Sequence, residues 1–177
     1  MIVTCVRNVD MKGDIMTAGH LHLILNHFPV IGSVIVLLLL MLAVYGGSND
    51  VARAALSLAV LVGVVSLVVY FTGEPAESLI ERLPGFSEDL TERHEDAALV
   101  ATILVGVTSV LALAVLATHR RGRSLSRRTI ATATGISLVA CGALGYTAFL
   151  GGQIRHTEIR PGNSASAVVG EHEGTGP

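Results

Sequence analysis

The chain has 177 residues, of which 51% are hydrophobic and only 15% are charged, and its formal net charge at pH 7 is −2. The low charged fraction and the positive mean hydropathy of +0.64 exclude a highly charged disordered chain. The near-neutral charge balance excludes a strongly basic nucleic-acid-binding protein, so we expect no nucleic-acid partner. Two cysteines are too few for an iron–sulfur cluster held by four thiolates.

The first twenty residues contain neither an apolar core nor a small-residue cleavage site, so no signal peptide is predicted. Residues 1–15 add charges to a tail that has to cross the membrane, and Met16 is an alternative start. We therefore treat residues 1–15 as an extension outside the domain. The predicted membrane domain covers residues 16–160, and the small, polar residues 161–177 form a predicted disordered tail.

Four long apolar stretches follow one another along the domain, over residues 21–45, 51–71, 97–117 and 129–150. About 20 apolar residues in a helix span a bilayer core of about 30 Å, and open strand edges cannot remain in lipid. The sequence therefore predicts an all-α membrane protein embedded in a lipid bilayer. Short connections make neighbouring helices antiparallel, which predicts an up-down-up-down four-helix bundle.

The connections differ in charge, and this difference predicts the orientation. Residues 119–128 contain five arginines and no acid, whereas residues 72–96 contain eight acids and two arginines. Positive residues stay on the cytoplasmic side, so the arginine-rich loop is expected inside and the acidic loop and both termini outside. This pattern predicts a multi-pass protein of the bacterial inner (cytoplasmic) membrane with periplasmic termini. Within the acidic loop, a short helix is expected from Glu74 through Leu83, before the break at Pro84.

Three histidines are the main functional candidates. His27, His94 and His156 each lie at the end of a different apolar stretch, and the predicted topology puts all three at the outer face. Ionisable side chains at such positions in membrane helices are functional candidates by default. Because the first and third helices of a bundle can be diagonal partners, His27 and His94 are expected to be axial ligands of haem b. His156 is the alternative ligand.

Residues near His156 complete the predicted haem site. Arg155 and Arg160 could pair with the propionates, since arginine holds carboxylates with two parallel hydrogen bonds. Gly152 could leave room for the macrocycle. His20 and His22 are weaker candidates that we expect in the headgroup region, with His22 pointing elsewhere. The leading hypothesis is a b-type-cytochrome-like subunit that passes electrons between quinol or a larger complex and a periplasmic partner.

The same residues are compatible with other sites. Three histidines with an open position match a zinc or copper site, with nearby glutamates as further ligands or supporting partners. A quinone could sit near Tyr70 or Tyr146. Alternatively, the protein could be a cofactor-free accessory subunit of a larger respiratory or transport complex. No nucleophile–base pair is visible, so no enzymatic activity is assigned to the chain on its own.

Four short segments carry a family resemblance: residues 20–32 (HLHLILNHFPVIG), 72–77 (TGEPAE), 93–98 (RHEDAA) and 150–156 (LGGQIRH). Together they resemble a group of uncharacterised bacterial four-helix membrane proteins classed as a domain of unknown function. Relatives of that class occur fused to, or beside, Rieske-type and cytochrome-type redox proteins. The resemblance covers roughly residues 16–160. It implies the four-helix fold and other membrane redox subunits as partners, and it brings no established activity.

Overall fold

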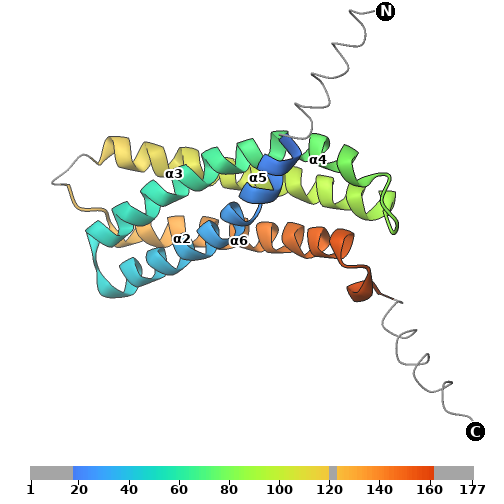
Figure 1. Ribbon diagram of the computed structural model, residues 1–177. Helices are drawn as coiled ribbons and strands as arrows, with labels where there is room; N and C mark the ends of the chain where they lie inside the picture. Colours follow the sequence, from blue (N-terminus) through green and yellow to red (C-terminus); the bar gives the residue numbers. More distant parts are fainter. Residues whose placement is uncertain (1–17, 120–122, 162–177) are drawn as a thin grey trace, which may run out of the picture.

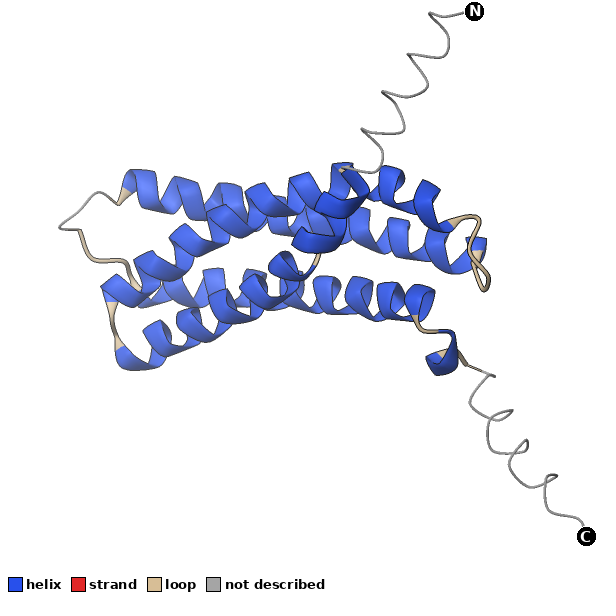
Figure 2. Ribbon diagram, viewed as in Figure 1, coloured by secondary structure: helices blue, strands red, loops and turns tan. Residues whose placement is uncertain are grey.

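The protein is a bundle of four long helices that lie side by side (Figure 1). The computed structural model describes residues 18–119 and 123–161, and all regular structure within these ranges is helical (Figure 2). The all-α fold with four helices of membrane length is therefore confirmed. The predicted extension 1–15 and residues 162–177 of the predicted tail lie outside the described residues.

The long helices are joined by short connections, apart from one acidic segment that folds into a helix of its own. In chain order the elements are α2 (His27–Gly46), α3 (Asn49–Phe71), α4 (Gly73–Ile80), α5 (Glu88–Thr118), α6 (Arg127–Arg155) and the 3₁₀ turn η1 (Thr157–Ile159). Residues 18–25 are helical too and join α2 across a turn at Asn26. The first membrane-length segment is therefore Ala18–Gly46.

The four long helices follow the order α2, α3, α5, α6 around the bundle, so α2 and α5 are diagonal partners. Residues 18–25, α4 and η1 all lie at one end of the bundle, which we call the α4 end (Figure 1). The opposite end holds the α2–α3 turn and the connection before α6, and we call it the arginine end. This arrangement confirms the up-down-up-down topology and the short helix in the acidic loop.

At the arginine end, the α2–α3 turn is fixed by local hydrogen bonds. Gly47 adopts a left-handed backbone conformation (φ 66°) and its N–H donates to the carbonyl of Ala43 at 2.9 Å, which closes α2. The side chain of Ser48 accepts from the backbone N–H of Val51 and caps α3. The side chain of Asn49 instead accepts from the backbone N–H of Leu125 and ties the turn to the connection before α6.

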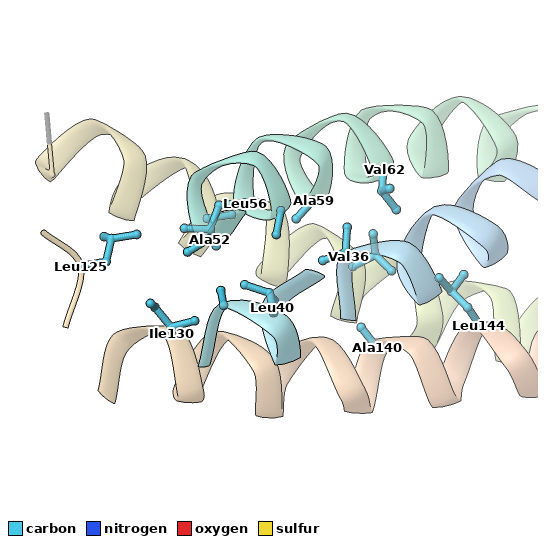
Figure 3. Close-up of a cluster of buried hydrophobic side chains, with 14 of the residues drawn as sticks. Val36, Leu40, Ala52, Leu56, Ala59, Val62, Leu125, Ile130, Ala140 and Leu144 are labelled. Carbon is cyan, nitrogen blue, oxygen red and sulfur yellow. The ribbon is translucent and has the colours of Figure 1, made fainter. Parts of the chain in front are cut away.

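The core is built largely from small and branched apolar residues that bring the helices close together (Figure 3). The fully or nearly fully buried alanines are Ala43, Ala52, Ala55, Ala59, Ala101, Ala112 and Ala140. Close approach of membrane helices depends on such small residues. Between α3 and α5, Gly63 faces Ser109, whose hydroxyl donates to the carbonyl of Ala59 at 2.7 Å.

The outer surface of the bundle is apolar. Of the most apolar 18-residue window in each of the four long helices, only 17–33% is buried inside the bundle. Large side chains such as Leu42, Val110 and Leu138 remain more than half exposed. Contiguous apolar surface of this extent requires a lipid environment or a protein partner. Together with the lengths of the helices, this surface makes the chain an integral membrane protein.

Candidate functional site

The first residue of the candidate site is His22, in the helical segment 18–25. This segment leaves the axis of α2 and crosses the α4 end of the bundle (Figure 1). Gly19 packs directly against Leu79 of α4, which holds the segment in place. The Nδ1 atom of His22 lies 2.9 Å from the carbonyl oxygen of Val69, in the last turn of α3. The imidazole of His22 is therefore anchored to the end of α3.

The second residue is His94, in the second turn of α5. Its Nδ1 atom lies 3.0 Å from the carbonyl oxygen of Thr147 in α6. The half-buried ring rests on Gly151, where a Cβ atom would be 3.1 Å from Cε1 of the imidazole. His94 therefore bridges α5 to α6, as His22 bridges the first segment to α3.

His22 and His94 share one geometry and lie near each other. Their imidazoles are close enough for a positive charge on one to oppose a positive charge on the other. A carbonyl oxygen only accepts hydrogen bonds, so Nδ1 carries the proton in both rings. In a neutral imidazole Nε2 then holds a free lone pair. No hydrogen bond within residues 18–119 and 123–161 uses either Nε2.

The other predicted histidines lie elsewhere. His27 is the first residue of α2 and its side chain is exposed. His156 follows the end of α6, is exposed, and pairs through Nδ1 with Glu158 at 2.8 Å. The described part of the chain contains no group of three or more His, Cys, Asp or Glu side chains that could hold a metal ion. The structure thus does not gather His27, His94 and His156, and it places His22 near His94 instead.

Pro29 explains why the facing of His22 was predicted wrongly. A proline has no N–H and its ring clashes with the carbonyl four residues earlier, here that of Leu25. The helix is interrupted directly after this position, at Asn26, and residues 18–25 take a direction of their own. If helical turns are counted through Asn26 as if the helix were continuous, His22 is expected to point away from the site. In the structure its ring contacts the last turn of α3 instead. Pro29 itself was the signal in the sequence, because a proline disrupts the helix in the turn before it.

The remaining predicted site residues have structural contacts of their own. Arg160 donates from Nε to the carbonyl of Gln153 at 2.8 Å and from a terminal nitrogen to the carbonyl of Ile154 at 3.0 Å. It thereby satisfies carbonyls that the last turn of α6 leaves open. Arg155 is exposed. At Gly152 a Cβ atom would meet only Ile159, so the glycine that contacts an imidazole is its neighbour Gly151.

Two carboxyl groups form a second polar contact at the α4 end. Glu77 of α4 shares a hydrogen bond with Glu95, the residue that follows His94. This hydrogen bond, burial and the nearby carboxylates of Glu95, Glu81 and Glu74 raise the pKa of Glu77 to about 7. A protonated carboxyl group can donate a hydrogen bond to an ionised one. As long as Glu77 and Glu95 share one proton, their hydrogen bond therefore holds α4 against α5.

Four helices of membrane length define a polytopic membrane protein. The histidine pair lies at one end of it. A family model described as "Predicted membrane protein (DUF2231)" matches residues 19–158, so the chain belongs to this family. The match includes all four long helices, α4 and both members of the histidine pair. No match to the chain was found among curated proteins or among solved structures.

Proposed function

We propose that this protein is a membrane-embedded electron-transfer subunit similar to b-type cytochromes, with His22 and His94 as the ligands of one haem b. The observation that supports this proposal is the matched geometry of the two rings. Each Nδ1 donates to a helix carbonyl, which leaves each Nε2 lone pair available. Histidines that bind metals almost always donate their other ring N–H in this way, because the hydrogen bond fixes the tautomer and the ring orientation.

The number of ligands favours haem over a free metal ion. Zinc sites take at least three protein ligands, and the described residues contain no cluster of three such side chains. Haem brings four porphyrin nitrogens of its own and needs only one or two protein ligands. When bound, haem supplies a one-electron carrier. The residues of this chain would bind the group, fix both imidazoles as neutral ligands and shield it from water with apolar helices.

The position of the pair indicates where electrons would enter and leave. His22 and His94 lie at the α4 end, opposite the arginine-rich connection. The positive-inside rule places the arginine end in the cytoplasm, and therefore the pair near the outer membrane surface. A carrier there is within reach of both a quinol in the bilayer and a redox protein in the periplasm. We propose these two classes as the electron-transfer partners.

The test is a reduced-minus-oxidised optical spectrum of the detergent-purified protein, with haem and metal analysis of the same sample. We expect a b-type spectrum that is lost in His22→Ala and in His94→Ala. His27→Ala and His156→Ala are matched controls, since both side chains are exposed, and we expect them to keep the spectrum. The thermal midpoint of each apoprotein shows whether a variant is still folded. A folded, haem-free wild type expressed with ample haem would refute the proposal.

A cofactor-free accessory subunit is the second candidate. One observation favours it: both histidines already join separate helices through their carbonyl hydrogen bonds, and this gives them a structural role without a ligand. In that case the purified protein would be colourless and free of metal. This candidate would be supported if other membrane subunits copurified with the protein, and if they still did so with the histidine variants.

A further inference from the structure

The arginine end of the bundle, far from the histidine pair, carries a group of exposed positive charges (Figure 1). Arg123 lies in the connection before α6, and Arg127 and Arg128 form the start of α6; all three are exposed. We call these three residues the arginine patch. No ion pair within residues 18–119 and 123–161 involves any of them, and Asp50 is the one acid of the described arginine end.

The connection that carries Arg123 is fixed to the rest of the bundle. Nη2 of Arg53, near the start of α3, donates to the backbone carbonyl of Arg123 at 2.7 Å. Two residues further on, Leu125 is only 5% exposed and belongs to the hydrophobic core. Its backbone N–H donates to the side chain of Asn49. The backbone that leads into α6 is therefore held at three points.

The two arginines of α6 stand where a helix normally has negative charge. The N-terminus of a helix carries a partial positive charge, so acidic side chains are stabilising there and basic ones are not. The other helices follow this rule, with Asp50 in the first turn of α3 and Glu88 and Asp89 in the first turn of α5. The first turn of α6 contains no acid and begins with Arg127 and Arg128. A bound anion beside this turn would offset the repulsion.

The depth of the patch in the membrane indicates which anion this is. The apolar stretch 129–150 starts directly after Arg128, so the patch lies where the hydrocarbon core gives way to the lipid headgroups. Arginine binds phosphate through two parallel hydrogen bonds, and its apolar stem can run along the hydrocarbon boundary. Phospholipids present their phosphate groups at this depth. An anionic headgroup adds the net negative charge that complements the patch.

We propose that Arg123, Arg127 and Arg128 together bind the headgroup of one anionic phospholipid. Such a site is more than an orientation signal, because the positive-inside rule counts positive residues and does not require them to be fixed to another helix. The site is independent of the proposed haem. It also holds for either orientation, since it requires only that the arginine end lies at a membrane surface.

The first test measures lipid retention by native mass spectrometry. The protein is reconstituted in nanodiscs of equal parts phosphatidylglycerol and phosphatidylcholine and then transferred to detergent. We expect the wild type to retain one phosphatidylglycerol. Arg127→Gln/Arg128→Gln should bind it about 10- to 30-fold more weakly, since each arginine at an anionic lipid surface contributes about a factor of five. The loop keeps Arg120, Arg121 and Arg123, which preserve the orientation signal.

Two further variants sharpen this measurement. Arg123→Gln removes one side chain of the patch but keeps the backbone carbonyl that accepts from Arg53, and we expect about fivefold weaker binding. Arg82→Gln/Arg155→Gln is the matched control, because it removes two exposed arginines at the α4 end. We expect this control to retain phosphatidylglycerol like the wild type.

The second test uses thermal unfolding in detergent to separate lipid binding from folding. Without lipid, Arg127→Gln/Arg128→Gln should unfold at the same temperature as the wild type or slightly higher, because the repulsion at the start of α6 is removed. Added phosphatidylglycerol should raise the midpoint of the wild type and of the control, and much less that of the double variant. The rise should shrink at high salt, because the contacts are between exposed charges.

Three results would overturn the proposal. Equal retention of phosphatidylcholine and phosphatidylglycerol would mean that the acyl chains alone hold the lipid. Equal binding of phosphatidylglycerol by the wild type, the double variant and Arg123→Gln would mean that the patch is not the site. An equal rise of the midpoint with inorganic phosphate in place of the lipid would mean that the patch binds a soluble anion.

Discussion

His94 of α5 lies in direct contact with Gly151 of α6. A Cβ atom at Gly151 would be 3.1 Å from Cε1 and 3.4 Å from Nδ1 of the imidazole. The same Nδ1 is 3.0 Å from the carbonyl oxygen of Thr147, one turn earlier on α6. The ring reaches that carbonyl by passing over the glycine, so the absence of a side chain at residue 151 is part of what positions His94.

We therefore expect Gly151→Ala to displace the His94 ring and to lengthen or break its hydrogen bond to Thr147. Crowding of this kind typically costs about 1–3 kcal/mol of stability, and it should also lower the haem content if His94 is a ligand. The measurements are the thermal midpoint and the haem-to-protein ratio. Gly145→Ala is the control, because a Cβ atom there meets nothing within 4 Å. Equal behaviour of the two variants would contradict the assigned role of Gly151.

Most of the fold could be predicted from the sequence. The bilayer requires long apolar stretches, and these can be recognised without any knowledge of how the helices pack. Apolar stretches of about 20 residues mark the spans, and Pro84 and Ser87 mark the break and the cap before α5. The expected start of the third span, residue 97, lies beyond the observed helix start at Glu88. Polar helical turns outside the bilayer do not show in a hydropathy pattern, which accounts for the difference.

The site was less predictable, because it depends on where side chains point. His94 is a candidate from the sequence because it lies at the end of an apolar stretch, whereas the facing of His22 depends on the helix break before Pro29. Arg160 donates to carbonyls of α6, and nothing in the sequence indicates these contacts. Such contacts require three-dimensional positions that composition and spacing do not contain.

The contact between Gly63 and Ser109 predicts a coupled pair. A Cβ atom at residue 63 would collide with the side chain of Ser109, which itself donates to the carbonyl of Ala59. Gly63→Ala should therefore destabilise the α3–α5 packing by about 1–3 kcal/mol. Gly106→Ala, at a position with open space, is the matched control on α5. A double-mutant cycle of Gly63→Ala with Ser109→Gly should give a smaller loss than the sum of the single variants, and strict additivity would refute the contact.

The carboxyl pair predicts a pH dependence with a definite sign. The pKa of Glu77 is raised from 4.5 to about 7 by its hydrogen bond to Glu95, by burial and by nearby carboxylates. Between these two pH values the folded state binds more protons than the unfolded state, so stability falls as pH rises from about 4.5 to about 7. Glu77→Gln should remove this slope, because a neutral amide keeps a donor at all pH values.

The measurement is the thermal midpoint of the wild type and of Glu77→Gln between pH 5 and pH 8. Other groups titrate equally in both proteins, so the difference between the two pH slopes of the midpoint is due to Glu77. Glu92→Gln is the control, because Glu92 is exposed and does not contribute to the environment of Glu77. Carbon-13 spectra of the Glu77 carboxyl should show a midpoint near 7. A midpoint near 4.5, or an equal pH slope in wild type and Glu77→Gln, would contradict the shared proton.

Arg160 distinguishes a structural role from a role in cofactor binding. Its guanidinium donates to the carbonyls of Gln153 and Ile154 and closes the end of α6 beside the site. Arg160→Ala should therefore lower the stability of the protein without cofactor by about 1–2 kcal/mol, the range for hydrogen bonds from a charged donor in a partly exposed position. Arg155→Ala, which removes an exposed arginine from the same helix end, should change stability little. If Arg160 held a haem propionate instead, Arg160→Ala would leave the cofactor-free protein unchanged and alter only the haem content or its reduction potential.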